Sequence, residues 1–322
     1  MILLLIAGFV GLIKGADLFV DGSAALARNL KVPSLIIGLT IVAMGTSAPE
    51  LAVSTSAAIQ GANEIALSNV IGSNLFNSLV VLGACALFCA VPVDKIVLKR
   101  DFPLSIIVTV LIFAVVGGKS IVTGSLFNKT MADNAGTVYR WLGILLLVIF
   151  IAYITYLVIN AKRHPEPETD EKKKPYWQCF LFIVIGIALI AGGGEAVVLS
   201  AKYIAKAAGM TETLIGLTVV ALGTSLPELV TSCVAAKKGE TGLAIGNVVG
   251  SNIFNLMLIL GTSSTIHPVE SNVASVYDMG ILIFISILIY IFAATKKKIV
   301  RAEGIVMLVI YIATMAFAII RK

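Results

Sequence analysis

Two glutamates lie in the middle of apolar stretches of this chain, each at the end of the same arrangement of small and polar residues. The first run is Gly38-Leu-Thr-Ile-Val-Ala-Met-Gly-Thr-Ser-Ala-Pro-Glu50, and the second, from Gly216 to Glu228, repeats it with three apolar replacements. A charged side chain inside a membrane costs at least about 2.5 to 3.5 kcal/mol on insertion scales, so such an acid is by default a functional group that needs a partner. We therefore predict that Glu50 and Glu228 meet at one site.

The duplication extends beyond the two acids. The run from Asn69 to Asn77, Asn-Val-Ile-Gly-Ser-Asn-Leu-Phe-Asn, matches the run from Asn247 to Asn255, and both pairs of runs are offset by 178 residues. When residues 36–83 are laid on 214–261 without a gap, 26 of 48 positions are identical. The chain is therefore one unit written twice.

The residues before each acid are typical of an interrupted helix. Glycine, a Thr46-Ser47 pair and Pro49 precede Glu50, which predicts a helix that stops and restarts within the membrane, with Thr46 or Ser47 capping the restart. The interruption should free backbone carbonyls such as that of Ala43, and exposed backbone at membrane depth needs a partner, which a cation can be. The second run offers the same roles to Ala221, Thr224, Ser225 and Glu228.

The second repeated run adds further oxygen ligands. Ser73 and Asn77 are four residues apart and share a helix face, as do Ser251 and Asn255. All of these donors are oxygens, which favours a hard cation over zinc or copper. Calcium takes six to eight oxygens, and two glutamates would neutralise its charge, while sodium can use the same groups. Small-residue packing between helices is the alternative interpretation of Gly-Ser-Asn, but it does not explain two acids.

Composition places these runs in a membrane. The 322 residues are 58% hydrophobic and 13% charged, with a mean hydropathy of +1.01, which is typical of an all-α polytopic membrane protein. Ten stretches are long enough to span, near residues 2–27, 33–59, 64–90, 102–118, 138–160, 177–205, 212–236, 242–265, 277–295 and 300–320. Five spans per unit force the second unit to enter from the opposite side, so we predict two inverted five-helix repeats, with the second, third, seventh and eighth helices interrupted.

The cations predict the orientation. With the N-terminus outside, 16 Lys and Arg residues fall at inside ends and 7 at outside ends, so both termini should be extracytoplasmic in the cell (inner or plasma) membrane. The net charge of +6 then needs no nucleic-acid partner. Residues 161–176 are polar and rich in proline and charge, which predicts a cytoplasmic linker between repeats at 1–160 and 177–322.

The two Gly-Thr-Ser-x-Pro-Glu runs, each followed by Gly-Ser-Asn-x-Phe-Asn, resemble the alpha repeats of the calcium/cation antiporter superfamily, above all its prokaryotic sodium/calcium exchanger branch. The resemblance covers nearly the whole chain and implies ten helices in inverted repeats. It implies that Glu50 and Glu228 are the central calcium ligands. The further ligands that it implies are Ala43, Thr46, Ser47, Ser73, Asn77, Ala221, Thr224, Ser225, Ser251 and Asn255. Some relatives carry Asp where this chain has Asn255, which cannot titrate, and this difference argues against proton carriage at that position and against potassium dependence.

The resulting hypothesis is a sodium/calcium antiporter that works by alternating access, with the two ions as its partners, the lipid bilayer as its surroundings, and neither a cofactor nor catalytic residues. We expect it to function as a monomer. A proton-coupled calcium exchanger would share every ligand and differ only in the driving ion. A cation channel is a third possibility, because inverted repeats with half-helices also build pores, and a scaffold or receptor is the fourth.

Overall fold

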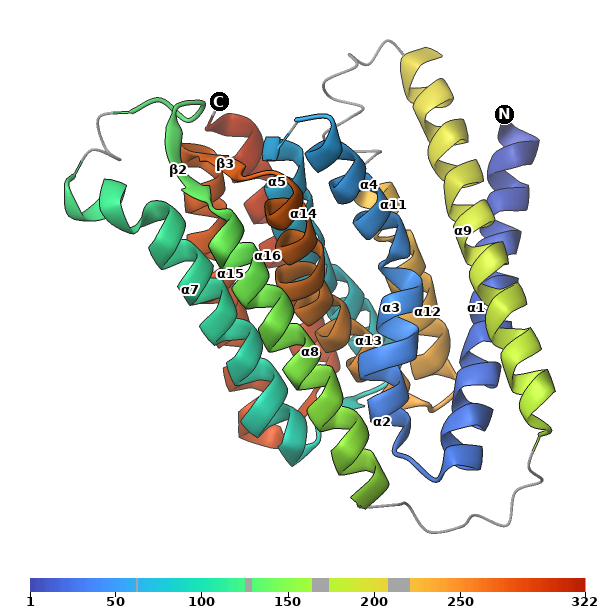
Figure 1. Ribbon diagram of the computed structural model, residues 1–322. Helices are drawn as coiled ribbons and strands as arrows, with labels where there is room; N and C mark the ends of the chain where they lie inside the picture. The colour runs from blue at the N-terminus through green and yellow to red at the C-terminus, as the bar shows by residue number, and fades with distance from the viewer. Residues whose placement is uncertain (62, 125–128, 164–173, 208–220, 322) are drawn as a thin grey trace. The chain divides into compact units, whose positions relative to one another are not determined.

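The computed structural model describes residues 1–61, 63–124, 129–163, 174–207 and 221–321, and almost all of its regular structure is helical (Figure 1). Eight of the described helices are long and apolar enough to cross a membrane, and a bent pair makes a ninth candidate. The eight are Ile2–Leu30 (α1), Ala66–Phe88, Val97–Val122, Arg140–Arg163 (α8), Tyr176–Ala207 (α9), Thr241–Ile266, Val273–Lys296 (α15) and Arg301–Ile320 (α16). A multi-pass membrane protein is confirmed. The count of ten and the inversion of the repeats stay predictions, since residues 212–220 of the seventh predicted span lie outside the described residues.

The chain folds into two compact units that cut across the sequence repeats. One unit combines residues 1–49 with 155–251, and the other combines 50–154 with 252–322. We refer to them as unit 1 and unit 2. Each unit therefore takes segments from both halves of the duplicated sequence. Most of the predicted linker, residues 164–173, lies outside the described part.

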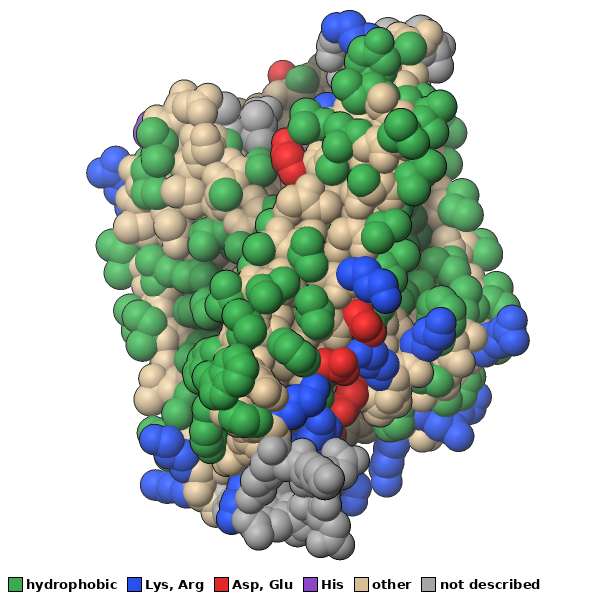
Figure 2. Space-filling model, turned by 90° about the vertical axis from the view of Figure 1, so that its right-hand side faces the viewer, with side chains coloured by type: hydrophobic (Ala, Val, Ile, Leu, Met, Phe, Trp, Pro, Cys, Tyr) green, Lys and Arg blue, Asp and Glu red, His purple; other side chains and the backbone are tan. Residues whose placement is uncertain are grey.

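In unit 1, α1 and α9 pack along each other (Figure 1). Glycines allow their backbones to approach closely. A Cβ added to Gly15 would lie 2.8 Å from the backbone N of Ile190, and one added to Gly186 would lie 2.8 Å from the backbone N of Phe19. The outer faces of these two helices carry exposed side chains such as Leu3, Ile6, Trp177 and Val184, and apolar side chains cover much of this surface in Figure 2. Such a surface suits contact with lipid.

The second predicted span is interrupted, as its sequence indicates. It runs as α2 (Ser34–Ile37), the π-helical η1 (Gly38–Val42) and α3 (Ala43–Thr46), breaks at Ser47, and restarts as α4 (Ala48–Ile59) with a bend of 50°. The described part of the seventh span shows the same break, because α11 (Ala221–Thr224) and α12 (Leu226–Lys237) are separated by Ser225. Pro49 and Pro227 each occupy the second position of the new helix, where the missing N–H costs nothing.

The predicted breaks in the third and eighth spans are wrong. Both helices continue through the site runs, and a π-helical segment takes the place of a break. The third span consists of α5 (Asn63–Phe76), η2 (Asn77–Val81) and α6 (Leu82–Phe88). The eighth consists of α13 (Thr241–Ile253), η6 (Phe254–Ile259) and α14 (Leu260–Ile266). One wider turn keeps the backbone hydrogen-bonded without proline, and such turns are frequent at functional sites.

Unit 2 also contains two short strand pairs that the sequence does not predict. β1 (Val91–Pro92) pairs antiparallel with β4 (Lys298–Ile299), and β2 (Asn134–Val138) pairs antiparallel with β3 (Val269–Asn272). Each pair joins a loop of the first repeat to a loop of the second. Helix α7 (Phe102–Val122), which follows the π-helical η3 (Val97–Asp101), packs against both β2 and α15. Hydrogen bonds between strands therefore hold the two repeats together within this unit.

Candidate functional site

Glu228 lies in the first turn of α12 and has no exposed surface. The Oγ of Ser47, at the break of the second span, donates a hydrogen bond of 2.9 Å to its Oε1. Its Oε2 is buried and makes no hydrogen bond within the described residues. Because Ser47 belongs to the first repeat and Glu228 to the second, the two repeats contribute jointly to one polar site.

Asn247 on α13 connects this acid-bearing helix to the broken one. Its Oδ1 accepts a hydrogen bond of 3.0 Å from Thr46 Oγ1, and its Nδ2 donates to Ser232 Oγ at 2.9 Å and to the Glu228 backbone O at 3.5 Å. All four residues, Asn247, Thr46, Ser232 and Glu228, have no exposed surface. A fully buried amide with both of its ends engaged holds the two helices in a defined register.

The same amide contact recurs around Glu50, in unit 2. Asn69 Nδ2 donates to Ser54 Oγ at 2.9 Å and to the Glu50 backbone O at 3.5 Å, the distances found around Glu228. Glu50 lies in the first turn of α4 and is 1% exposed. The predicted site residues did not include Asn69, Asn247, Ser54 and Ser232. Identity at both ends of a fixed 15-residue spacing in both repeats was the signal that could have found them.

A group of amides in unit 2 surrounds the π-helical turns. Asn255 Nδ2 donates to Asn74 Oδ1 at 2.9 Å and to Ser73 Oγ at 3.0 Å. Asn255 Oδ1 is buried without a hydrogen-bond partner in the described residues, and the same holds for both amide atoms of Asn77. Asn77 is the first residue of η2. Buried polar atoms of this kind need a ligand or an ordered water.

Two details of the predicted site are wrong. Ser225, the residue before α12, makes no side-chain capping bond, whereas capping of α4 by Thr46 or Ser47 stays a prediction. The Ala43 carbonyl is not freed by the break, because it accepts the Ser47 N–H at 3.0 Å. Thr46 Oγ1 also lies 3.3 Å from the same carbonyl oxygen. The cause is that the break is confined to one residue, so the last turn of α3 keeps its hydrogen bond.

The proposed ligands are divided between the two units. Unit 1 contains Ala43, Thr46, Ser47, Ala221, Thr224, Ser225, Glu228 and Ser251, and unit 2 contains Glu50, Ser73, Asn77 and Asn255. Within unit 1 the structure brings Ser47 and Glu228 together, and within unit 2 it brings Ser73 and Asn255 together. The meeting of Glu50 with Glu228 stays a prediction.

The donor set has a defined chemistry. Hydroxyls, amide oxygens and carbonyls accompany each acid, and the described residues contain no group of three or more His, Cys, Asp and Glu side chains that could hold a metal. Soft transition metals prefer thiolate and imidazole, whereas carboxylate, carbonyl and hydroxyl oxygens suit hard ions.

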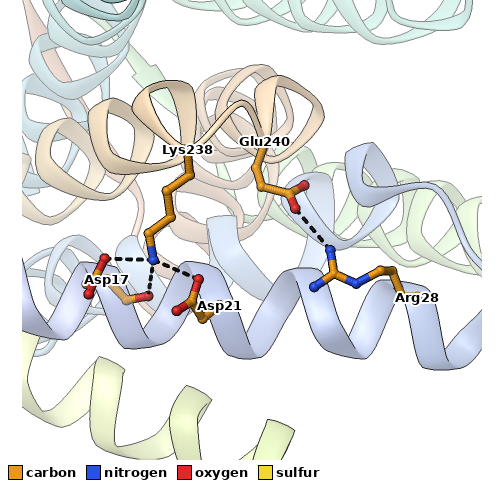
Figure 3. A network of polar contacts seen from close by, with 5 residues as sticks. All are labelled: Asp17, Asp21, Arg28, Lys238 and Glu240. Carbon is orange, nitrogen blue, oxygen red and sulfur yellow. Dashed lines mark hydrogen bonds and ion pairs between the residues drawn. The ribbon is translucent and has the colours of Figure 1, made fainter. Parts of the chain in front are cut away.

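Outside this site, a charged network links α1 to the end of α12 (Figure 3). Lys238 Nζ lies 2.6 Å from Asp17 Oδ1 and 2.7 Å from Asp21 Oδ1, and Arg28 Nη1 lies 3.2 Å from Glu240 Oε1. Partial burial alone would lower the pKa of Lys238, but hydrogen bonds and charges from the two aspartates outweigh burial and raise that pKa above its usual 10.5. Lys238, from the second repeat, thus pairs with both aspartates of the first helix.

Comparisons with known proteins agree with this chemistry. The sequence model of the family described as "Sodium/calcium exchanger protein" matches residues 1–159 and 179–320. CaxA of Alkalimonas amylolytica is 39% identical over 319 residues, covering 95% of both chains. The sodium/calcium exchanger MaX1 of Methanosarcina acetivorans is 33% identical, covering 97% of this chain and 96% of its own. A solved structure of the sodium-calcium exchanger NCX_Mj, soaked with sodium and strontium, superimposes with a TM-score of 0.82 at 32% identity, covering 98% of this chain and 97% of that one.

Proposed function

Because the chain belongs to the sodium/calcium exchanger family, we propose that it is an antiporter driven by sodium, which exchanges Na⁺ for Ca²⁺ at a site built on Glu50 and Glu228. The observation that carries the proposal is the environment of Glu228, a buried acid that takes a hydrogen bond from the other repeat and keeps a second, unbonded oxygen within the described residues. The matched relatives support cation and calcium exchange by the family as a whole.

The proposed ligands have distinct roles. Both carboxylates neutralise a calcium ion, or they hold sodium ions together with the hydroxyls of Thr46, Ser47, Ser73, Thr224, Ser225 and Ser251, the amides of Asn77 and Asn255, and the carbonyls of Ala43 and Ala221. Since the two ions compete for the same oxygens, one must leave before the other can bind. An empty pair of buried carboxylates is costly to carry through the membrane, because charge in a low-dielectric medium lacks solvation. Competition and this cost together couple the two fluxes.

The proposed cycle moves charge. If more than two sodium ions exchange for each calcium ion, turnover carries net charge, and the membrane potential contributes about 2.3 kcal/mol per elementary charge per 100 mV. We further propose that both termini are extracytoplasmic, because this orientation puts 16 of the 24 Lys and Arg residues at inside ends. A monomer provides both halves of the site and is the proposed functional form.

The decisive experiment measures calcium uptake by proteoliposomes loaded with sodium, at a fixed pH on both sides. An outward sodium gradient should drive uptake, and potassium in place of sodium should not. Glu228→Gln and Glu50→Gln should abolish it, while Glu270→Gln, which changes an exposed acid in β3, should leave it intact.

Each alternative gives a different result in the same vesicles. Uptake that follows a proton gradient and ignores sodium would replace the sodium exchanger with a proton-coupled one. Calcium currents far above carrier rates without counter-transport would indicate a channel. Normal ion binding by Glu228→Gln would refute the site.

A further inference from the structure

An asparagine side chain can serve a cation with only one of its two amide atoms. The amide oxygen of Asn255 can bind a cation, whereas its NH₂ group is a donor and would repel one. Its Nδ2 donates to Asn74 Oδ1 at 2.9 Å and to Ser73 Oγ at 3.0 Å. Its Oδ1 is buried with no hydrogen-bond partner in the described residues. Something must therefore select this orientation over the flipped one.

Asn74 supplies the selection, because a backbone carbonyl fixes its own orientation. Asn74 Nδ2 donates to the backbone O of Asn252 at 3.3 Å. A carbonyl can only accept, so the nitrogen of Asn74 must face it, and the oxygen of Asn74 must then face Asn255. That oxygen in turn can only accept, so Asn255 must present its nitrogen. Each step follows from which groups donate and which accept.

We propose that Asn74 is a positioning residue of the ion site, which holds the amide of Asn255 so that the oxygen remains available to the transported cation. The inference rests on the proposed ion site and adds a residue outside its ligands. Asn74 is 1% exposed, so water does not compete for its contacts. Asn77 differs, since neither of its amide atoms has a hydrogen-bond partner within the described residues. The hydrogen bonds from Asn252 through Asn74 to Asn255, which we call the relay, therefore fix the amide orientation of Asn255 but not that of Asn77.

A neighbouring bond in the same network provides a matched control. Asn252 Nδ2 donates to Ser78 Oγ at 2.9 Å. This contact lies beside the relay but is no part of it, because Asn74 is anchored by the backbone O of Asn252 and not by its side chain. Ser78→Ala thus removes a part-buried hydrogen bond from the network while the orientation of Asn255 is kept.

The test compares Asn74→Leu and Asn74→Ala with the control Ser78→Ala. Calcium concentration for half-maximal uptake and maximal rate are measured in sodium-loaded proteoliposomes, and calcium-induced thermal stabilisation is measured on the purified proteins. Loss of one oriented hydrogen bond corresponds to roughly a tenfold change. We expect both Asn74 variants to raise the half-maximal calcium concentration about tenfold with a smaller effect on maximal rate, and Ser78→Ala to change it less than about twofold.

A second background distinguishes positioning from packing. In Asn255→Asp both terminal atoms of the side chain are oxygens, so either orientation presents an oxygen to the ion. Asn74→Leu should therefore cause no further loss of calcium affinity when it is combined with Asn255→Asp. An equal loss in both backgrounds, or a normal half-maximal concentration in Asn74→Leu and Asn74→Ala, would overturn the inference. Failure of the proposed function looks different, because the unsubstituted protein would then show no sodium-driven calcium uptake. The stabilisation measurement needs no sodium gradient, so it scores calcium binding by each variant in either case.

Discussion

The two mirrored asparagines, Asn69 and Asn247, allow one quantitative prediction from their different surroundings. Each donates to a serine Oγ at 2.9 Å and to a glutamate backbone O at 3.5 Å. Asn247 has no exposed surface and also accepts from Thr46 at 3.0 Å, whereas Asn69 is half-buried. The perturbation is the same substitution at both positions, Asn247→Ala and Asn69→Ala.

The expected losses follow from the bonds and their burial. Asn247→Ala removes the hydrogen bonds to Thr46 and Ser232, which contribute about 1 kcal/mol each. It also leaves the buried Ser232 Oγ without its donor, which costs about 1 kcal/mol or more, so the total loss of stability is about 3 kcal/mol. Thr46 is not the stranded group, because its hydroxyl can turn to the Val42 carbonyl at 3.1 Å. Asn69 itself is half-buried, so water can enter the space that its side chain leaves and bond to Ser54, and Asn69→Ala should cost about 1 kcal/mol.

Thermal unfolding of the purified, chelator-treated protein in detergent measures the difference without a contribution from bound ions. At roughly 1 to 2 °C per kcal/mol for a chain of 322 residues, the midpoint should fall by about 3 to 6 °C for Asn247→Ala and about 1 to 2 °C for Asn69→Ala. The Thr46→Val background should reduce the effect of Asn247→Ala by about 1 kcal/mol, because the bond is already absent. Equal shifts at the two positions, or additivity with Thr46→Val, would refute the reasoning.

Three further substitutions test other contacts by thermal unfolding. Lys238 has a raised pKa, so its ion pair with Asp21 stabilises the folded state at pH values below the usual lysine pKa of 10.5, and this stabilisation is lost as the pH rises through the pKa of the folded state. We therefore expect the unfolding midpoint to fall above about pH 10.5 in the unsubstituted protein and to fall less in Lys238→Met. Tyr153→Phe removes a 2.9 Å bond to the buried carboxylate of Asp101 and should cost about 1.5 to 3 kcal/mol, and an unchanged midpoint would contradict this. Gly15→Ala places a Cβ 2.8 Å from the α9 backbone and should cost about 1 to 3 kcal/mol, whereas a stabilised variant would show that the helices separate freely.

Much of the helical fold was predictable, because membrane spans are set by length and hydropathy. Predicted spans such as 102–118 and 300–320 correspond to Val97–Val122 and Arg301–Ile320. The break at Ser47 was also predictable from proline and small residues. The π-helical turn at Asn77 was not, since no residue type requires it and only tertiary packing decides it. The strand pairs were missed because two-residue strands such as Val91–Pro92 carry no periodicity.

The composition of the site was predictable, but its hydrogen bonds were not. Repetition identifies Glu228 and Asn255 as special positions without saying what they contact. The hydrogen bond from Ser47 to Glu228 was not predictable, because the sequence does not show which residues of the other repeat lie beside a hydroxyl. Asn74 was overlooked because the sequence shows an amide without showing which end faces which neighbour.

The mixing of the repeats within each unit ties the polar residues of one run to those of the other. An acid or amide in the membrane cannot be satisfied by its own helix, whose backbone groups are already paired, so the missing partner has to come from another segment. Ser47 of the first repeat serves Glu228 of the second, and Ser73 of the first serves Asn255 of the second. Substituting Ser47 alone would therefore remove a hydrogen-bond donor from Glu228, and substituting Ser73 alone would remove an acceptor from Asn255.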